Sequence, residues 1–142
     1  MAVLLVSTAF VVSTALVACS SSHSFGDRYL TVMAPLNAAT TKFQREIAAL
    51  GSDPSAADVQ HVASPYASAI RQTTDRLLAI HWPSGVEEDM HQIATADRDL
   101  ASVLASAAGQ SGFSFSRWLS ELHGAERHTV TASNLTRQDL GI

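Results

Sequence analysis

The sequence predicts an all-α protein: an antiparallel up-down bundle of about four helices that follows an N-terminal signal segment. Three long segments repeat apolar residues at alternating intervals of four and three, which places those residues on one face of a helix. Short connections separate these segments, so consecutive helices are expected to be antiparallel neighbours. No stretch of useful length shows the residue alternation that is typical of a β-strand.

Length and composition indicate one domain with an apolar core. The 142 residues are 46% hydrophobic and 15% charged, whereas roughly 25% is usual for charged residues in soluble domains. Nine basic and thirteen acidic residues give a net charge of −4, and no basic run is present, so nucleic acid is not expected as the main partner. The single cysteine excludes an internal disulfide and a multi-cysteine zinc site.

The first 18 residues are expected to form a signal peptide. They carry no charge, and residues 2–18 are apolar or small throughout. Because 17 residues lie at the lower limit for crossing a bilayer, an uncleaved anchor helix is the alternative, and a buried helix of a soluble domain is a second one. No Lys or Arg precedes the apolar run, so we expect either an upstream start codon or inefficient export.

The only cysteine, Cys19, follows this apolar segment directly. The run Leu16-Val17-Ala18-Cys19 resembles the lipobox of bacterial lipoproteins. The resemblance implies that a diacylglyceryl group is attached to the Cys19 sulfur and that a peptidase cleaves before Cys19. Two or three acyl chains, palmitate among them, anchor a protein firmly where one would not. The implied location is the extracytoplasmic face of the cell membrane, with residues 19–27 as a flexible tether and residues 28–142 as the bundle domain.

The first predicted helix covers residues 28–50. Gly51 follows it as a common helix stop, and Pro35 indicates either a kink or a helix that begins near Ala34. The 4-3 repeat places these residues on the inward face of the helix: Tyr29, Met33, Leu36, Thr40, Phe43, Ile47 and Leu50.

The second predicted helix covers residues 55–80. Ser55 is expected to cap its start, with Asp58 three residues later, and the Trp82-Pro83 pair to end it. We expect Trp82 to plug the core over this turn and Trp118 to lie at the opposite end of the bundle. The spacing joins Val59, Ala63, Tyr66, Ile70, Thr73, Leu77 and Ile80.

The third predicted helix covers residues 85–108, and the fourth begins near Ser114 or Ser116. Ser84 and Glu87 have the spacing of a capping box before the third helix. The fourth helix either ends in the β-branched stretch 129–133 or continues to Leu140. The apolar positions are Val86, Met90, Ile93, Asp97, Leu100, Leu104 and Ala107 in the third helix, and Trp118, Leu119, Leu122, Ala125 and Thr129 in the fourth.

Two further stretches carry a second resemblance. Residues 76–83 (RLLAIHWP), the acidic helix after them, and residues 134–142 (NLTRQDLGI) resemble small helical lipoproteins of mycobacteria and related actinobacteria. The resemblance covers about half of the chain after Cys19. It implies a location in the cell envelope and no particular activity.

Asp97 is the strongest candidate for a functional side chain. It lies in the apolar stripe of its helix, where a carboxylate needs a partner or a proton. Counting from the Trp82-Pro83 turn places Asp97 level with Ile70. We therefore expect either a polar ligand-binding pocket in the core or a structural hydrogen-bond network, with Asp97 at the bundle edge beside an arginine as a third interpretation. The residues of this predicted pocket are Asp97, Tyr66, Thr73 and Thr40.

No motif of an enzyme or a metal site is recognised, so we expect no catalytic residue, metal or cofactor. Glu88-Asp89-Met90-His91 contains the Glu-x-x-His half of a di-iron site, but no second copy is present. Because Met90 is expected to face the core, Glu88 and His91 should point away from it. The chain also lacks a Gly-x-Ser-x-Gly nucleophile elbow.

The sequence thus predicts a membrane-anchored, non-enzymatic envelope lipoprotein that binds a protein partner or an apolar ligand. The alternative is a small envelope hydrolase or transferase of an unrecognised type, with its pocket around Asp97. A structural component of a larger envelope complex is a third candidate, which a large exposed apolar patch would favour.

Overall fold

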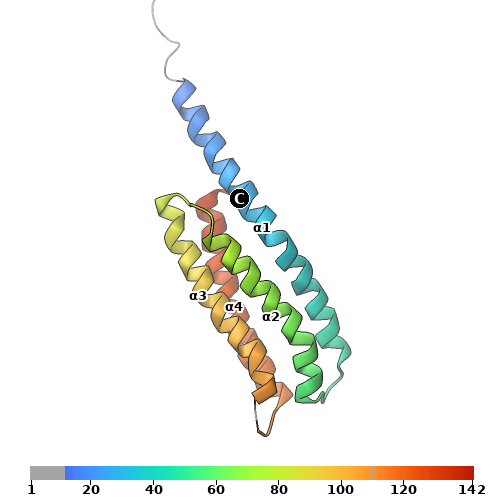
Figure 1. Ribbon diagram of the computed structural model, residues 1–142. Coiled ribbons are helices and arrows are strands. Elements are labelled where there is room, and N and C mark those ends of the chain that lie inside the picture. Colours follow the sequence, from blue (N-terminus) through green and yellow to red (C-terminus); the bar gives the residue numbers. More distant parts are fainter. Residues whose placement is uncertain (1–11, 110) are drawn as a thin grey trace, which may run out of the picture.

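Four long helices form an antiparallel bundle, which confirms the predicted all-α fold (Figure 1). The computed structural model describes residues 12–109 and 111–142. Its helices are α1 (Val12–Ala49), α2 (Ala56–Leu78), α3 (Ser84–Ser106) and α4 (Phe115–Leu140), with a 3-10 turn, η1, at Ala107–Gly109. Among the described residues there is no β-strand. Helices α1 and α2, α2 and α3, and α3 and α4 pack as neighbours, and α4 also touches α1.

Helix α1 is longer than predicted. It begins at Val12 and continues without a break through residues 19–27 and through Pro35, so it does not begin near Ala34. Its first part extends beyond the other three helices (Figure 1). Phe25, three residues before the predicted start of the bundle domain, packs against the Trp82 cluster. Residues 1–11 of the predicted signal peptide, and the Cys19 side chain, lie outside the part that the structure describes.

None of the helices between residues 12 and 142, as far as the structure describes them, combines the length and hydropathy needed to cross a membrane.

The capping box predicted for α2 is confirmed, whereas the one predicted for α3 is wrong. The Ser55 hydroxyl accepts from the Asp58 backbone N–H at 3.2 Å, and the Asp58 carboxylate accepts from the Ser55 N–H at 3.1 Å. Helix α3 instead has Pro83 as its N-cap, and the Pro83 carbonyl accepts from the N–H groups of Val86 and Glu87. Ser84 is therefore the first residue inside the helix. A side chain caps a helix from the N-cap position, which Pro83 occupies here.

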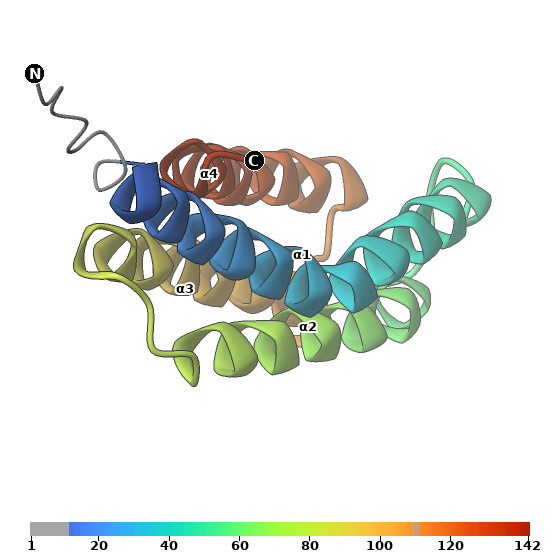
Figure 2. The same cartoon turned by 90° about the horizontal axis from the view of Figure 1, so that it is seen from above.

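Helix α4 continues to Leu140 rather than ending in the β-branched stretch. The Thr131 and Thr136 hydroxyls donate to the carbonyls four residues earlier, which keeps these side chains compatible with the helix. Gly141 ends the helix in the left-handed conformation, with φ of 70°. Ile142 then lies against Gly26, where an added Cβ would come within 2.7 Å of the Ile142 Cγ2. The part of α1 around Gly26 and the end of α4 are thus side by side at one end of the bundle (Figure 2).

The core consists of two apolar clusters that follow each other along the bundle. One surrounds Trp118, and the other surrounds Trp82 and includes Phe25 and Tyr29 of α1. The Trp82 indole N–H donates to the Leu77 carbonyl at 2.7 Å, and that of Trp118 donates to the Val103 carbonyl at 3.0 Å. Both indoles are buried, so the prediction that Trp82 plugs the core beside the Pro83 turn is confirmed.

Candidate functional site

The four polar residues predicted to form one pocket lie in two separate places. Asp97, Tyr66 and Thr73 are buried and Thr40 is half-buried, as the helical spacing predicts. Asp97 bonds to Thr74 between α3 and α2, whereas Tyr66 bonds to Thr40 between α2 and α1. The structure therefore brings Tyr66 and Thr40 together, and it gives Asp97 a partner outside the predicted set.

The hydrogen-bond partner of Asp97 is Thr74, the residue next to Thr73 of the predicted pocket. The Thr74 Oγ1 lies 2.7 Å from the Asp97 Oδ2, while the Asp97 Oδ1 is buried without a partner. Helix α2 packs against both α1 and α3, so it buries Thr73 and Thr74 alike. The 4-3 spacing marks one inward residue per helical turn, so it does not indicate whether Thr73 or Thr74 faces α3.

Burial favours the neutral form of Asp97, and the hydrogen bonds around it can accommodate that form. The Thr74 hydroxyl lies 3.0 Å from the Ile70 carbonyl as well as 2.7 Å from Asp97, and one hydroxyl hydrogen cannot serve both acceptors fully. When Asp97 is protonated, its own O–H donates to Thr74, and Thr74 donates to Ile70. Burial raises the pKa of Asp97 to about 6, against the opposing effect of the Thr74 hydrogen bond.

A small cavity of about 190 Å3 lies beside Asp97 between α2 and α3. Ile70 shares this cavity with Asp97, which confirms that the two residues are level. The exposed residues Arg71, Asp75 and Arg98 stand around it. Its volume is below the roughly 300 Å3 at which small-molecule sites usually begin. The arrangement therefore fits a structural hydrogen-bond network better than a ligand pocket.

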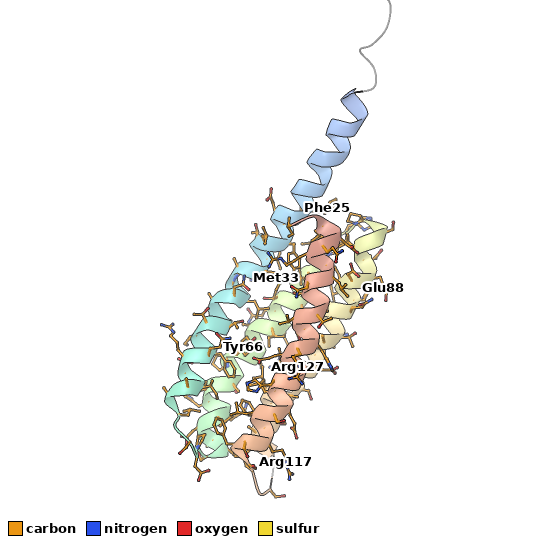
Figure 3. The ribbon with its side chains drawn as sticks, turned by 180° about the vertical axis from the view of Figure 1, so that it is seen from behind. Phe25, Met33, Tyr66, Glu88, Arg117 and Arg127 are labelled. Carbon is orange, nitrogen blue, oxygen red and sulfur yellow. The ribbon has the colours of Figure 1, made fainter. Side chains whose placement is uncertain are left out.

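A larger groove, of about 370 Å3, runs between α1 and α4. Its apolar lining includes Met33 and Leu36 from α1 and Leu100 from α3. Tyr66 of α2 lies at its base, and Figure 3 shows Met33 and Tyr66 between α1 and α4. We call this feature the α1–α4 groove.

Polar side chains gather at both ends of the α1–α4 groove. At one end the Tyr29 hydroxyl lies 2.9 Å from the Ser133 hydroxyl, and Arg137 is nearby. Burial raises the pKa of Tyr29, while the Ser133 hydrogen bond and the Arg137 charge act in the opposite direction. Tyr29 stands at a predicted inward position, but no sequence motif marks Tyr29, Ser133 or Arg137 as functional.

At the other end of the groove the Tyr66 hydroxyl lies 3.3 Å from the Thr40 hydroxyl, and the Tyr66 ring stacks on Phe43. Glu126 of α4 is close enough to raise the pKa of Tyr66, although burial raises it more. Burial also raises the pKa of Glu126 itself. The buried Thr129 Oγ1 has no hydrogen-bond partner. This end therefore offers oxygen atoms that can accept hydrogen bonds.

The Glu-x-x-His segment lies on the opposite side of α4. Met90 is buried, and Glu88 and His91 are exposed, as predicted. They line a groove of about 470 Å3 between α3 and α4 together with Asp99 and His128. Across the described residues, no group of three His, Cys, Asp or Glu side chains is placed to hold a metal ion.

Comparison of the chain with models of protein families, with curated proteins and with solved structures finds no match.

Proposed function

We propose that the protein is a non-enzymatic binding module of the cell envelope that holds an apolar ligand in the α1–α4 groove. The observation that carries this proposal is the groove itself, because its apolar lining lies between two polar ends. A volume of about 370 Å3 lies within the range of small-molecule sites. Leu30 and Val130 line it while 43% and 57% exposed, and a bound ligand would cover this apolar surface.

Binding can be tested with N-phenyl-1-naphthylamine, an uncharged dye that fluoresces in apolar sites. The full chain carrying Cys19→Ser, which removes the acylation site, should bind the dye. Val130→Trp places a bulky ring at the groove and should weaken binding at least tenfold.

Leu135→Trp is the matched control, because Leu135 is also exposed on α4 but lines the groove on the α3 side. It should leave dye binding unchanged. Loss of binding in Leu135→Trp alone would place the ligand between α3 and α4 and would contradict the proposal.

The proposed membrane location rests on Cys19 and the lipobox before it. Cys19 precedes Phe25, the first packed residue among the described side chains, by six residues of the same helix, so an attached lipid would hold the domain near the bilayer surface. The intact mass of the protein from the membrane fraction tests this. Residues 19–142 plus diacylglycerol, with or without a third acyl chain, are expected, whereas an unlipidated mass that includes residues 1–18 would contradict lipid anchoring.

A small hydrolase or transferase is the second candidate function. The observation that favours it is a carboxyl group with a raised pKa beside the Thr74 hydroxyl. The size of the neighbouring cavity argues against it. Hydrolysis of p-nitrophenyl esters that Asp97→Asn abolishes without loss of helicity would favour the enzyme over the binding module.

A further inference from the structure

The two charged side chains of the α1–α4 groove stand at opposite ends. Among the described residues that line the groove, Arg137 is the one basic residue and Glu126 the one acidic residue. Both belong to α4 and lie eleven positions apart, which corresponds to roughly 16 Å along the helix. Met33, Leu36 and Leu100 supply apolar surface in the same groove.

The Arg137 end is suited to an anion. Among the described residues, no carboxylate lies within ion-pair distance of Arg137. The single ion pair found among them joins Lys42 and Glu46. The Tyr29 and Ser133 hydroxyls line the groove together with Arg137. The Tyr29 and Ser133 hydroxyls bond to each other, which leaves one hydroxyl hydrogen free. This hydrogen and the Arg137 guanidinium match the oxygen atoms of a carboxylate or phosphate.

The Glu126 end is suited to a hydrogen-bond donor. The Thr129 hydroxyl is buried and unpartnered, whereas Thr131 and Thr136 on the same helix donate to the carbonyls four residues earlier. Glu126 is about half-buried and forms no ion pair among the described residues, and desolvation raises its pKa. A donor from a ligand could bond to the Thr129 oxygen or to the Glu126 carboxylate.

We propose that the ligand is a chain-like amphiphile, with an anionic head at Arg137, an alkyl middle over Met33 and Leu100, and a hydrogen-bond donor at the Glu126 end. This inference rests on the proposed function, since it assigns chemistry to the same groove. It also sets the orientation of the ligand, because the two polar ends differ in charge.

Three compounds with the same chain length test the proposal: dodecanol, dodecanoate and 12-hydroxydodecanoate. Each competes with N-phenyl-1-naphthylamine for the full chain carrying Cys19→Ser. We expect dodecanoate to bind about tenfold more tightly than dodecanol, because a charge-assisted hydrogen bond forms at Arg137. We expect 12-hydroxydodecanoate to gain about a further threefold from its terminal hydroxyl.

Substitutions at each end assign the gains to residues. Arg137→Gln should remove the preference for dodecanoate over dodecanol, and Glu126→Leu should remove the gain from the terminal hydroxyl. Arg127→Gln and Glu121→Leu are the matched controls, because both residues are exposed on α4 and do not line the groove. Far-UV circular dichroism should show unchanged helicity in all four variants.

Different outcomes separate the two proposals. Equal binding of dodecanol and dodecanoate by the unsubstituted groove, or no gain from the terminal hydroxyl, would overturn the ligand class. An effect of Arg127→Gln equal to that of Arg137→Gln would overturn the assigned orientation. If none of the compounds and no dye bind, the proposed function itself fails.

Discussion

The substitution Asp97→Asn tests the hydrogen-bond chain between α2 and α3 most directly. The asparagine amide has the shape of the protonated acid and stays neutral at every pH. Its NH2 group can donate to the Thr74 hydroxyl, which in turn donates to the Ile70 carbonyl. We therefore expect the variant to match the protonated wild-type protein in structure and to differ from it only where Asp97 would ionise.

The size of the effect follows from the pKa of Asp97. A rise from 3.8 to about 6 on folding, at 1.36 kcal/mol per pH unit, corresponds to about 3 kcal/mol. Because the folded-state pKa is raised, this stabilisation is fully present below the unfolded pKa and is lost as the pH rises through 6. The difference in unfolding free energy between Asp97→Asn and wild type should therefore grow from near zero at acid pH to about 3 kcal/mol at alkaline pH, in favour of the variant.

Urea unfolding followed by far-UV circular dichroism, near pH 3, below the unfolded-state pKa of Asp97, and near pH 8, measures this difference. Asp75→Asn is the matched control, because Asp75 is an exposed carboxyl at the same cavity, and this variant keeps Asp97. It should retain the pH dependence of the wild type. If Asp97→Asn retained it as well, Asp97 would not be the group that titrates, and a pKa of Asp97 raised by burial would be refuted.

Three further substitutions test other contacts. Tyr29→Phe removes the hydrogen bond to Ser133 between α1 and α4, and urea unfolding should show a loss of about 1 kcal/mol; an unchanged value would mean that this bond adds nothing to the bundle. Gly141→Ala forces a side chain into the left-handed conformation and should cost about 1 kcal/mol, measured as a lower melting temperature. Thr74→Val removes the one hydrogen-bond partner of the Asp97 carboxyl, so the loss of unfolding free energy should be larger at alkaline pH than at acid pH. Equal losses at both pH values would contradict that last expectation.

The helices could be predicted from the sequence because their signals are local. The 4-3 spacing depends only on the geometry of one helix, and its inward positions from Tyr29 to Ala107 are buried or half-buried. The Ser55–Asp58 cap is equally local and is confirmed. The Ser84 cap failed because Pro83 accepts the first hydrogen bonds with its backbone carbonyl, which the residue type at Ser84 does not reveal.

The candidate sites could be predicted only in part, because they depend on how helices face each other. Burial of Asp97 followed from its place in the apolar stripe, but its partner did not, because α2 buries two adjacent threonines. The α1–α4 groove joins Tyr29 and Arg137, which lie at opposite ends of the chain. The 4-3 repeat of apolar residues does not reveal the distance between the first and the last helix. A groove between these two helices therefore cannot be predicted from the sequence. Lipid attachment at Cys19 stays a prediction.

The two buried indoles are natural fluorescent probes of the two ends of the core. Trp82 and Trp118 are the two tryptophans of the chain, and each stands in a different apolar cluster. Indole emission shifts in wavelength when water reaches the ring, so Trp82→Phe and Trp118→Phe each leave a single fluorophore. That fluorophore reports one end of the bundle without an added label. Coincident unfolding curves from the two variants would identify one cooperative unit, and separated curves would identify an end that opens first.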